Sequence, residues 1–222
     1  MVFDSSPSKS FIETQKKLRK KNVFLYYPNI LGYIRIVLVF IALYSAFRSW
    51  KTLCICYTIS QLLDAADGVL ARYFSQATVF GSVLDQVTDR LSTVTILLLD
   101  SIVHPEYYFW FCLVLILDLS GHWVHTFASI CAGSKSHKNI PTTWPFLKLY
   151  YERKVFMFLC HSGNEFVWIT IFLLTQLHPH HSLVPLLYTI LIPSIILCLF
   201  KNVTNVAQLI YGAQVLGAVD LS

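Results

Sequence analysis

The sequence predicts an all-α integral membrane protein with six transmembrane helices. Of its 222 residues, 55% are hydrophobic and only 13% are charged, whereas a soluble domain usually has about 25% charged residues. The mean hydropathy is +0.59. The apolar residues fall into runs close to the roughly 20 residues that one membrane-spanning helix needs. We expect a polar N-terminal tail over residues 1–22, a single helical membrane domain over 23–217, and a C-terminal tail over 218–222.

The N-terminal segment is polar and basic. Residues 11–24 combine the basic run Lys16–Lys21 with apolar positions such as Phe11, Ile12 and Val23. This pattern predicts a short interfacial helix that lies on the membrane surface before the first span. A solvated basic tail that only sets the topology explains the same residues, and the sequence does not choose between the two.

Six apolar runs follow, each bounded by polar or turn-forming residues. The sixth contains Pro185 and Pro193, which can kink a membrane helix when its neighbours satisfy the freed backbone groups. Its last part, from Asn202, is more polar, so we expect the helix to leave the membrane there. The expected spans cover residues 29–47, 51–73, 80–103, 106–133, 154–177 and 183–216.

The distribution of basic residues orients the bundle. Cytosolic flanks of membrane spans carry an excess of Lys and Arg. Only Arg48 and Lys51 lie on the side opposite to the basic tail, so we expect both termini in the cytosol, and with them the connection 74–79. The basic residues on the expected cytosolic side are Lys9, Lys16, Lys17, Arg19, Lys20, Lys21, Lys135, Lys138, Lys148, Arg153, Lys154 and Lys201.

Four carboxylates stand inside the second and third expected spans. Asp64 and Asp67 are three residues apart, and Asp85 and Asp89 are four apart, so each pair shares one helical face. A charged side chain near the bilayer centre costs about 3 kcal/mol and usually marks function. Four hard oxygen donors on two facing helices suit one or two divalent cations, such as Mg²⁺ or Mn²⁺.

The residues around these carboxylates suit a diphosphate. Gly68 removes a side chain beside Asp67 and lets a ligand approach the helix backbone. Arg72, one turn further on, offers a planar guanidinium to phosphate oxygens. Gly81 stands one turn before Asp85 and leaves room for a ligand or a close helix. Arg35 in the first span and Arg90 beside Asp89 either balance the carboxylates or bind phosphate.

Together these residues form the pattern D-x2-D-G-x2-A-R-x8-G-x3-D-x3-D, which runs from Asp64 to Asp89 without a departure. The chain thereby resembles the CDP-alcohol phosphatidyltransferase family. The resemblance implies the family's six-helix membrane fold, a homodimer, a cavity open to the cytosol, and divalent metal ions held by Asp64, Asp67, Asp85 and Asp89. It also implies that Asp89 is the general base.

The resemblance assigns further residues to the CDP-diacylglycerol donor. Gly68 and Arg72 belong to the motif itself, and Thr78 fills the Ser/Thr position three residues before Gly81. Asn29 matches a Pro-Asn element near the nucleotide.

Outside the core motif, the chain resembles the eukaryotic branch of the family that uses inositol. The segments that carry this likeness are 23–35, 118–125, 133–138, 149–151 and 163–165. The branch implies transfer of a phosphatidyl group from CDP-diacylglycerol to myo-inositol in the endoplasmic reticulum membrane. Because inositol is neutral, its pocket needs hydrogen-bonding groups, and position and resemblance suggest Gln86, His137, Lys138, Asn164 and Glu165.

Several alternatives remain at this stage. Another acceptor alcohol, such as serine or glycerol phosphate, fits the core motif equally well. A cation or proton-coupled transporter also places carboxylates in spans, but the sequence has neither internal repeats nor a polar path across the membrane. Asp118, His122 and His125 share a helical face and form either a packing network or a metal site. No nucleic-acid-binding motif is present.

Overall fold

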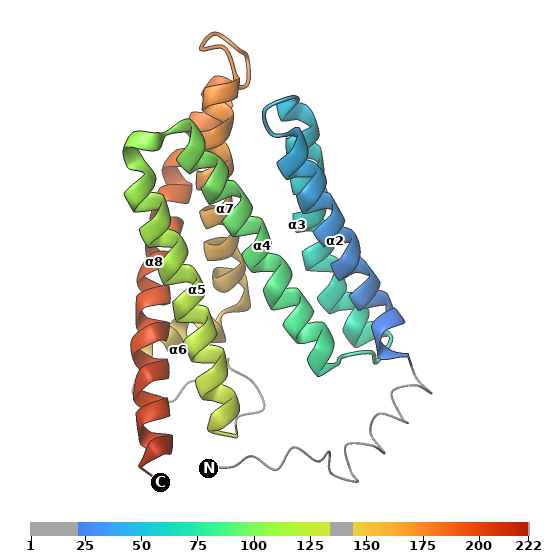
Figure 1. Ribbon diagram of the computed structural model, residues 1–222, viewed down its shortest axis with the longest axis vertical. Helices are drawn as coiled ribbons and strands as arrows, with labels where there is room; N and C mark the ends of the chain where they lie inside the picture. The colour runs from blue at the N-terminus through green and yellow to red at the C-terminus, as the bar shows by residue number, and fades with distance from the viewer. Residues whose placement is uncertain (1–21, 134–143, 222) are drawn as a thin grey trace, which may run out of the picture. The chain divides into compact units, whose positions relative to one another are not determined.

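A computed structural model describes residues 22–133 and 144–221, and every regular element in these ranges is a helix (Figure 1). This confirms the all-α class. In chain order the elements are η1 (Val23–Leu25), α2 (Tyr27–Ser45), α3 (Trp50–Tyr73), α4 (Val79–Val103), η2 (Pro105–Tyr107), α5 (Tyr108–Cys131), α6 (Pro145–Glu152), α7 (Lys154–Gln176) and α8 (Val184–Asp220).

Among the described residues, five stretches are long and apolar enough to cross a membrane: α2, α3, α5 with η2 before it, α7, and α8. The integral membrane character is therefore confirmed. The third expected span corresponds to α4, whose 25 residues are sufficient in length, but four charged side chains between Asp85 and Asp100 lower its apolar character. Six spans therefore remain a prediction. The expected interfacial helix lies largely outside the described residues; only Val23–Leu25 of that segment is described, as a 3₁₀ turn.

Local sequence features explain where the helices near the carboxylates begin. Ser49 caps α3, because its side chain accepts a hydrogen bond from the Thr52 amide at 3.3 Å. Thr78 caps α4 in the same way, because its hydroxyl accepts a hydrogen bond from the Gly81 amide at 3.0 Å. Both caps satisfy backbone donors that a helix leaves open at its first turn. The Thr78 cap fixes the start of the helix that carries Asp85 and Asp89.

The chain forms two compact units, and the boundary between Ser92 and Thr93 lies inside α4. In the N-terminal unit, α2 and α3 pack side by side (Figure 1). Glycines let the first half of α4 approach α2 in the same unit. A Cβ at Gly32 would lie 2.7 Å from Leu84 Cδ2, and one at Gly81 would lie 2.7 Å from Asn29 Oδ1. Small residues allow such close helix contacts within membranes.

In the C-terminal unit, α8 packs against both α5 and α7. A Cβ at Gly121 of α5 would clash with the backbone carbonyl of Asn205, and one at Gly212 would lie 3.0 Å from the His125 backbone. The polar residues in the second half of α8 include Lys201, Asn205 and Gln208, all buried. These polar residues therefore contact neighbouring helices, and the expected exit of the end of α8 from the membrane stays a prediction.

Candidate metal and diphosphate site

The four aspartates of the motif come from the end of α3 and the first half of α4. Oxygen atoms of Asp64, Asp67 and Asp85 all lie within 4.8 Å of one another, the only such group of potential metal ligands in the described ranges. Their side chains are 32%, 13% and 44% exposed. Asp89 lies one turn after Asp85 and is 29% exposed. The carboxylates are thus clustered yet accessible.

Arg35 of α2 joins all four carboxylates. Its Nη1 lies 2.5 Å from Asp64, 3.4 Å from Asp67 and 3.2 Å from Asp85. Its Nη2 donates a 2.7 Å hydrogen bond to Asp89 Oδ1. The arginine side chain has no exposed surface. Of the two roles that the sequence allowed for Arg35, balancing the carboxylates is the one that these contacts show.

Asn29 is held close to the start of α4. Its side chain is fully buried, and its Nδ2 donates to the Val23 carbonyl at 2.7 Å. The amide oxygen faces Gly81, so Gly81 leaves space that any larger residue would take from Asn29. A Cβ on Gly81 would also lie 3.1 Å from the Thr78 hydroxyl. The structure therefore brings Asn29, Thr78 and Gly81 together.

Gly68 and Arg72 share one face at the end of α3. A Cβ on Gly68 would meet the Arg72 guanidinium at 3.5 Å, an ordinary contact distance, and would meet no other atom within 4 Å except on that same guanidinium. Arg72 itself is exposed. Gly68 is therefore not required by packing inside the described protein, and an exposed guanidinium stands beside it. This arrangement leaves open space next to a positive charge.

The residues predicted for the acceptor are dispersed along the chain. Gln86 lies in the N-terminal unit and is half-buried. In the C-terminal unit, Asn164 accepts hydrogen bonds from Trp168 at 3.3 Å and Cys198 at 3.4 Å. Glu165 accepts one from the Thr93 hydroxyl at 2.6 Å. His137 and Lys138 lie outside the described residues.

Asp118 and His125 belong to a packing network. Lys201 of α8 donates to Asp118 at 3.0 Å, and the Asn205 side chain donates to the same oxygen at 3.1 Å. The ring of His125 stacks on Tyr151 with centroids 5.7 Å apart. The sequence left open a metal site here, but these contacts support the packing alternative. Lys201, one of the basic residues on the expected cytosolic side, is buried and paired within the unit.

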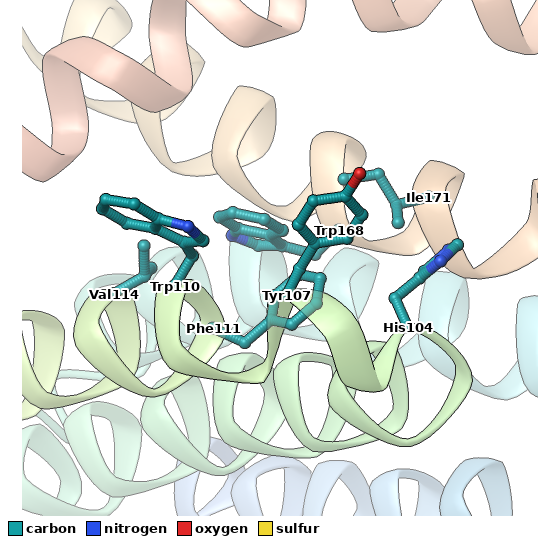
Figure 2. Close-up of a pocket in the computed structure, with 7 residues that line it drawn as sticks. All are labelled: His104, Tyr107, Trp110, Phe111, Val114, Trp168 and Ile171. Carbon is teal, nitrogen blue, oxygen red and sulfur yellow. The ribbon is translucent and has the colours of Figure 1, made fainter.

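Mostly aromatic and aliphatic side chains of η2, α5 and α7 line a cavity of about 330 Å³ in the C-terminal unit (Figure 2). The indole rings of Trp110 and Trp168 lie on this cavity, and Tyr107 extends beside them. The lining consists of His104, Tyr107, Trp110, Phe111, Val114, Trp168 and Ile171. Almost all lining atoms are apolar, so the cavity lacks the groups that phosphate chemistry needs.

The carboxylate cluster has the chemistry of a divalent metal site. Carboxylate oxygens are the preferred ligands of Mg²⁺ and Mn²⁺, and three of them are already close enough to share an ion. Glycine and arginine next to the cluster suit the phosphates of a nucleotide-linked substrate. The donor set therefore fits the metals that the sequence predicts.

Comparison with known proteins identifies the family. The family model described as CDP-alcohol phosphatidyltransferase matches residues 25–219. Two relatives are each named CDP-diacylglycerol–inositol 3-phosphatidyltransferase. The Candida albicans protein is 35% identical over 98% of this chain and 94% of its own length. The Homo sapiens protein is 34% identical over 90% of this chain and 95% of its own length.

A Drosophila melanogaster relative with the same name is 38% identical over 75% of this chain and 71% of its own length. No solved structure matches the chain significantly. The family match covers most of the sequence and includes every residue of the aspartate motif. The chain therefore belongs to the CDP-alcohol phosphatidyltransferase family.

Proposed function

We propose that the protein transfers the phosphatidyl group of CDP-diacylglycerol to myo-inositol, which gives phosphatidylinositol and CMP. The observation that carries the reaction is the cluster of Asp64, Asp67 and Asp85 with Asp89 beside it, on the motif of the family. The acceptor is supported by the relatives, because those from fungi, animals and plants are named for inositol.

The aspartates have two kinds of role. Asp64, Asp67, Asp85 and Asp89 would hold Mg²⁺ or Mn²⁺, most simply as two ions, which would neutralise the diphosphate and stabilise the charge that develops during displacement. Asp89 is in addition the general base. Its carboxylate is held on one side by Arg35 Nη2 at 2.7 Å, which fixes the orientation of the group. A fixed carboxylate serves as a base when the hydroxyl proton lies within hydrogen-bond reach.

The reaction is a single in-line displacement at phosphorus. Asp89 accepts the proton of an inositol hydroxyl as the oxygen attacks the phosphorus that bears diacylglycerol. A new bond forms between that phosphorus and the inositol oxygen, and the bond to the CMP phosphate oxygen breaks. CMP leaves with the bonding electrons, and the proton on Asp89 passes to solvent or to the departing phosphate. No oxidant or further reactant is needed.

The donor is bound by the residues on either side of the aspartates. The exposed guanidinium of Arg72 pairs with the phosphates, and Gly68 lets them approach the α3 backbone. Asn29 of α2 and Thr78 just before α4 both face Gly81, and they bind the nucleotide end. The acyl chains remain in the membrane lipid. The cluster comes from the second half of α3 and the first half of α4, the two halves that the connection joins.

Fewer observations support the residues of the acceptor site than those of the donor site. Myo-inositol has six hydroxyls and no charge, so it is recognised by hydrogen bonds. Gln86, His137, Lys138, Asn164 and Glu165 remain our candidates. Asn164 and Glu165 have partners within their own unit, so either residue must exchange or share a hydrogen bond when it contacts inositol.

The proposal also covers the membrane in which the protein lies and its orientation there. We place the protein in the endoplasmic reticulum membrane as a multi-pass homodimer, with the cluster facing the cytosol, where inositol enters and CMP leaves. The basic residues that flank the expected spans support this orientation. Single cysteines at Ser75 and Ser182 would test it, since only the first should react from the cytosolic side of sealed vesicles.

The reaction is tested with purified protein in detergent. CDP-diacylglycerol is supplied with one alcohol at a time (myo-inositol, serine or glycerol 3-phosphate), with and without Mg²⁺ or Mn²⁺, and CMP is measured. We expect metal-dependent CMP release with myo-inositol. Equal or faster release with serine or glycerol phosphate would show that the acceptor is wrong. No release with any of these alcohols would contradict the enzymatic assignment.

A further inference from the structure

Arg35 lies at the centre of the aspartate cluster and contacts the same carboxylates that would bind metal. One guanidinium contacts carboxylate oxygens of Asp64, Asp67, Asp85 and Asp89, at 2.5, 3.4, 3.2 and 2.7 Å. The arginine side chain is completely buried, while each aspartate is partly exposed. Arg35 therefore reaches the carboxylates from inside the protein, and their other side is open to a ligand.

The close approach of α2 to α4 delivers the guanidinium. Asn29, Gly32 and Arg35 follow one another at intervals of three, so they lie along one side of α2. Gly32 faces Leu84, the residue just before Asp85, and a Cβ at Gly32 would lie 2.7 Å from Leu84 Cδ2. Asn29 faces Gly81 one turn earlier. These two contacts determine the position of Arg35 along α4, beside Asp85 and Asp89.

We propose that Arg35 is a built-in counter-cation that competes with the divalent metals for the same carboxylates and thereby sets the metal affinity of the site. The inference rests on the proposed function, in that the aspartates bind metal. Four carboxylates in one partly exposed cluster repel one another, and Arg35 compensates one of the four charges. The cluster therefore stays folded when metal concentrations are low.

The competition follows from shared ligands. A guanidinium contact and a divalent ion each draw on the same oxygen lone pairs, and two cations close to one another repel. Binding of one must therefore weaken binding of the other, and by linkage the effect is reciprocal. Removal of the guanidinium should strengthen metal binding. If Arg35 acted only by holding the carboxylates in a geometry that suits metal, its removal would weaken metal binding instead.

Two substitutions separate these outcomes. Arg35→Gln removes the charge and keeps a polar side chain of intermediate length. Arg35→Lys keeps the charge, but an ammonium is a compact point charge and cannot present a planar fork to opposite carboxylates. Arg48→Gln is the matched control, because Arg48 lies just beyond the same helix, is exposed, and donates to the Tyr44 carbonyl.

The experiment measures Mn²⁺ affinity by electron paramagnetic resonance on purified, chelator-treated protein without either substrate. Loss of a charge-assisted contact corresponds to a change on the order of tenfold. We expect Arg35→Gln to bind Mn²⁺ roughly tenfold more tightly than wild type, Arg35→Lys to fall between them, and Arg48→Gln to match wild type. In chelator, Arg35→Gln should unfold at a lower temperature, and Mn²⁺ should raise its midpoint more than that of wild type.

Equal or weaker Mn²⁺ binding in the two Arg35 variants would overturn the inference but would not contradict the metal site. If Arg35→Gln does not fold, Arg35→Lys decides the matter by the same criterion. Absence of Mn²⁺ binding in wild type would instead contradict the metal site itself, and the inference would fall with it.

Discussion

The Lys201 ammonium of α8 lies 3.0 Å from a carboxylate oxygen of Asp118 on α5, and both side chains are at most 4% exposed. Asn205 contacts both partners and completes the set. A buried ion pair compensates charges that would each be expensive to bury alone. The pair therefore makes the packing of α5 on α8 depend on two residues that lie 83 positions apart.

The first prediction concerns this pair. Asp118→Leu or Lys201→Met should each lower the free energy of unfolding by about 3–5 kcal/mol, because each leaves an uncompensated buried charge. The double variant should be more stable than either single variant. Thermal unfolding in detergent measures all three, with Lys154→Met as a control at an exposed lysine. Additive losses in the double variant would argue against a direct pair.

The second prediction concerns the contact between α5 and α8. A Cβ at Gly121 would clash with the backbone carbonyl of Asn205, which cannot rotate away. Gly121→Ala should therefore destabilise the protein by about 1–3 kcal/mol. Gly217→Ala, where no atom lies within 4 Å of the new carbon, should be neutral or slightly stabilising because alanine favours helix. Comparable midpoints for the two variants would contradict the close contact.

The third prediction separates binding from folding at Gly68. An alanine there would meet only the Arg72 guanidinium, at 3.5 Å or more, so the unfolding temperature should stay within about a degree of that of wild type. If the phosphates of the donor approach the backbone at this position, KM for CDP-diacylglycerol should rise on the order of tenfold or more. An unchanged KM would remove Gly68 from the donor site.

The fourth prediction concerns the general base. Asp89→Asn should retain CDP-diacylglycerol binding and lose turnover by a factor of at least 100, within the range expected for loss of a general base. Binding is measured with a labelled donor and turnover by CMP release. Asp64→Ala provides the comparison, because it should lose metal-dependent activity as a ligand. Near-normal turnover in Asp89→Asn would exclude Asp89 as the base.

The fifth prediction concerns Asp100 in the second half of α4. Its side chain is fully buried, and neither carboxylate oxygen has a hydrogen-bond partner among the described residues. An unsatisfied buried polar group costs about 1–3 kcal/mol. Asp100→Leu, which is close in size, should therefore raise the unfolding temperature. Asp220→Leu changes an exposed carboxylate and should have little effect. A lower midpoint for Asp100→Leu would show that the carboxylate is stabilised.

The sequence predicted the helices well because helix formation leaves a local signal. The expected spans 29–47 and 154–177 correspond to α2 (Tyr27–Ser45) and α7 (Lys154–Gln176), with ends that differ by two residues or fewer. It did not predict α6, which has only eight residues. It also did not show that polar residues in the second half of α8 are buried against other helices, because buried polar residues and solvated ones look alike in composition.

The candidate site was predictable as a set of residues. Fixed spacing placed Asp64 with Asp67 and Asp85 with Asp89 on single helical faces, and the family motif joined the two pairs. Arg35 was different. Arg35 lies far from the motif in the sequence, so its contacts could not be predicted, and both charge balance and phosphate binding stayed open.

The sequence by itself determined the all-α membrane class, the order of the long helices, the aspartate motif and the family. These properties depend on composition and on spacing along one helix. Only the tertiary structure decided that Arg35 meets all four carboxylates and that Lys201 pairs with Asp118. Such contacts depend on the distance between two helices and on their relative position along the helix axis. Packing at glycines such as Gly32 and Gly121 sets both. Periodicity shows which side of a helix a residue occupies, but the partner across from it is decided by packing.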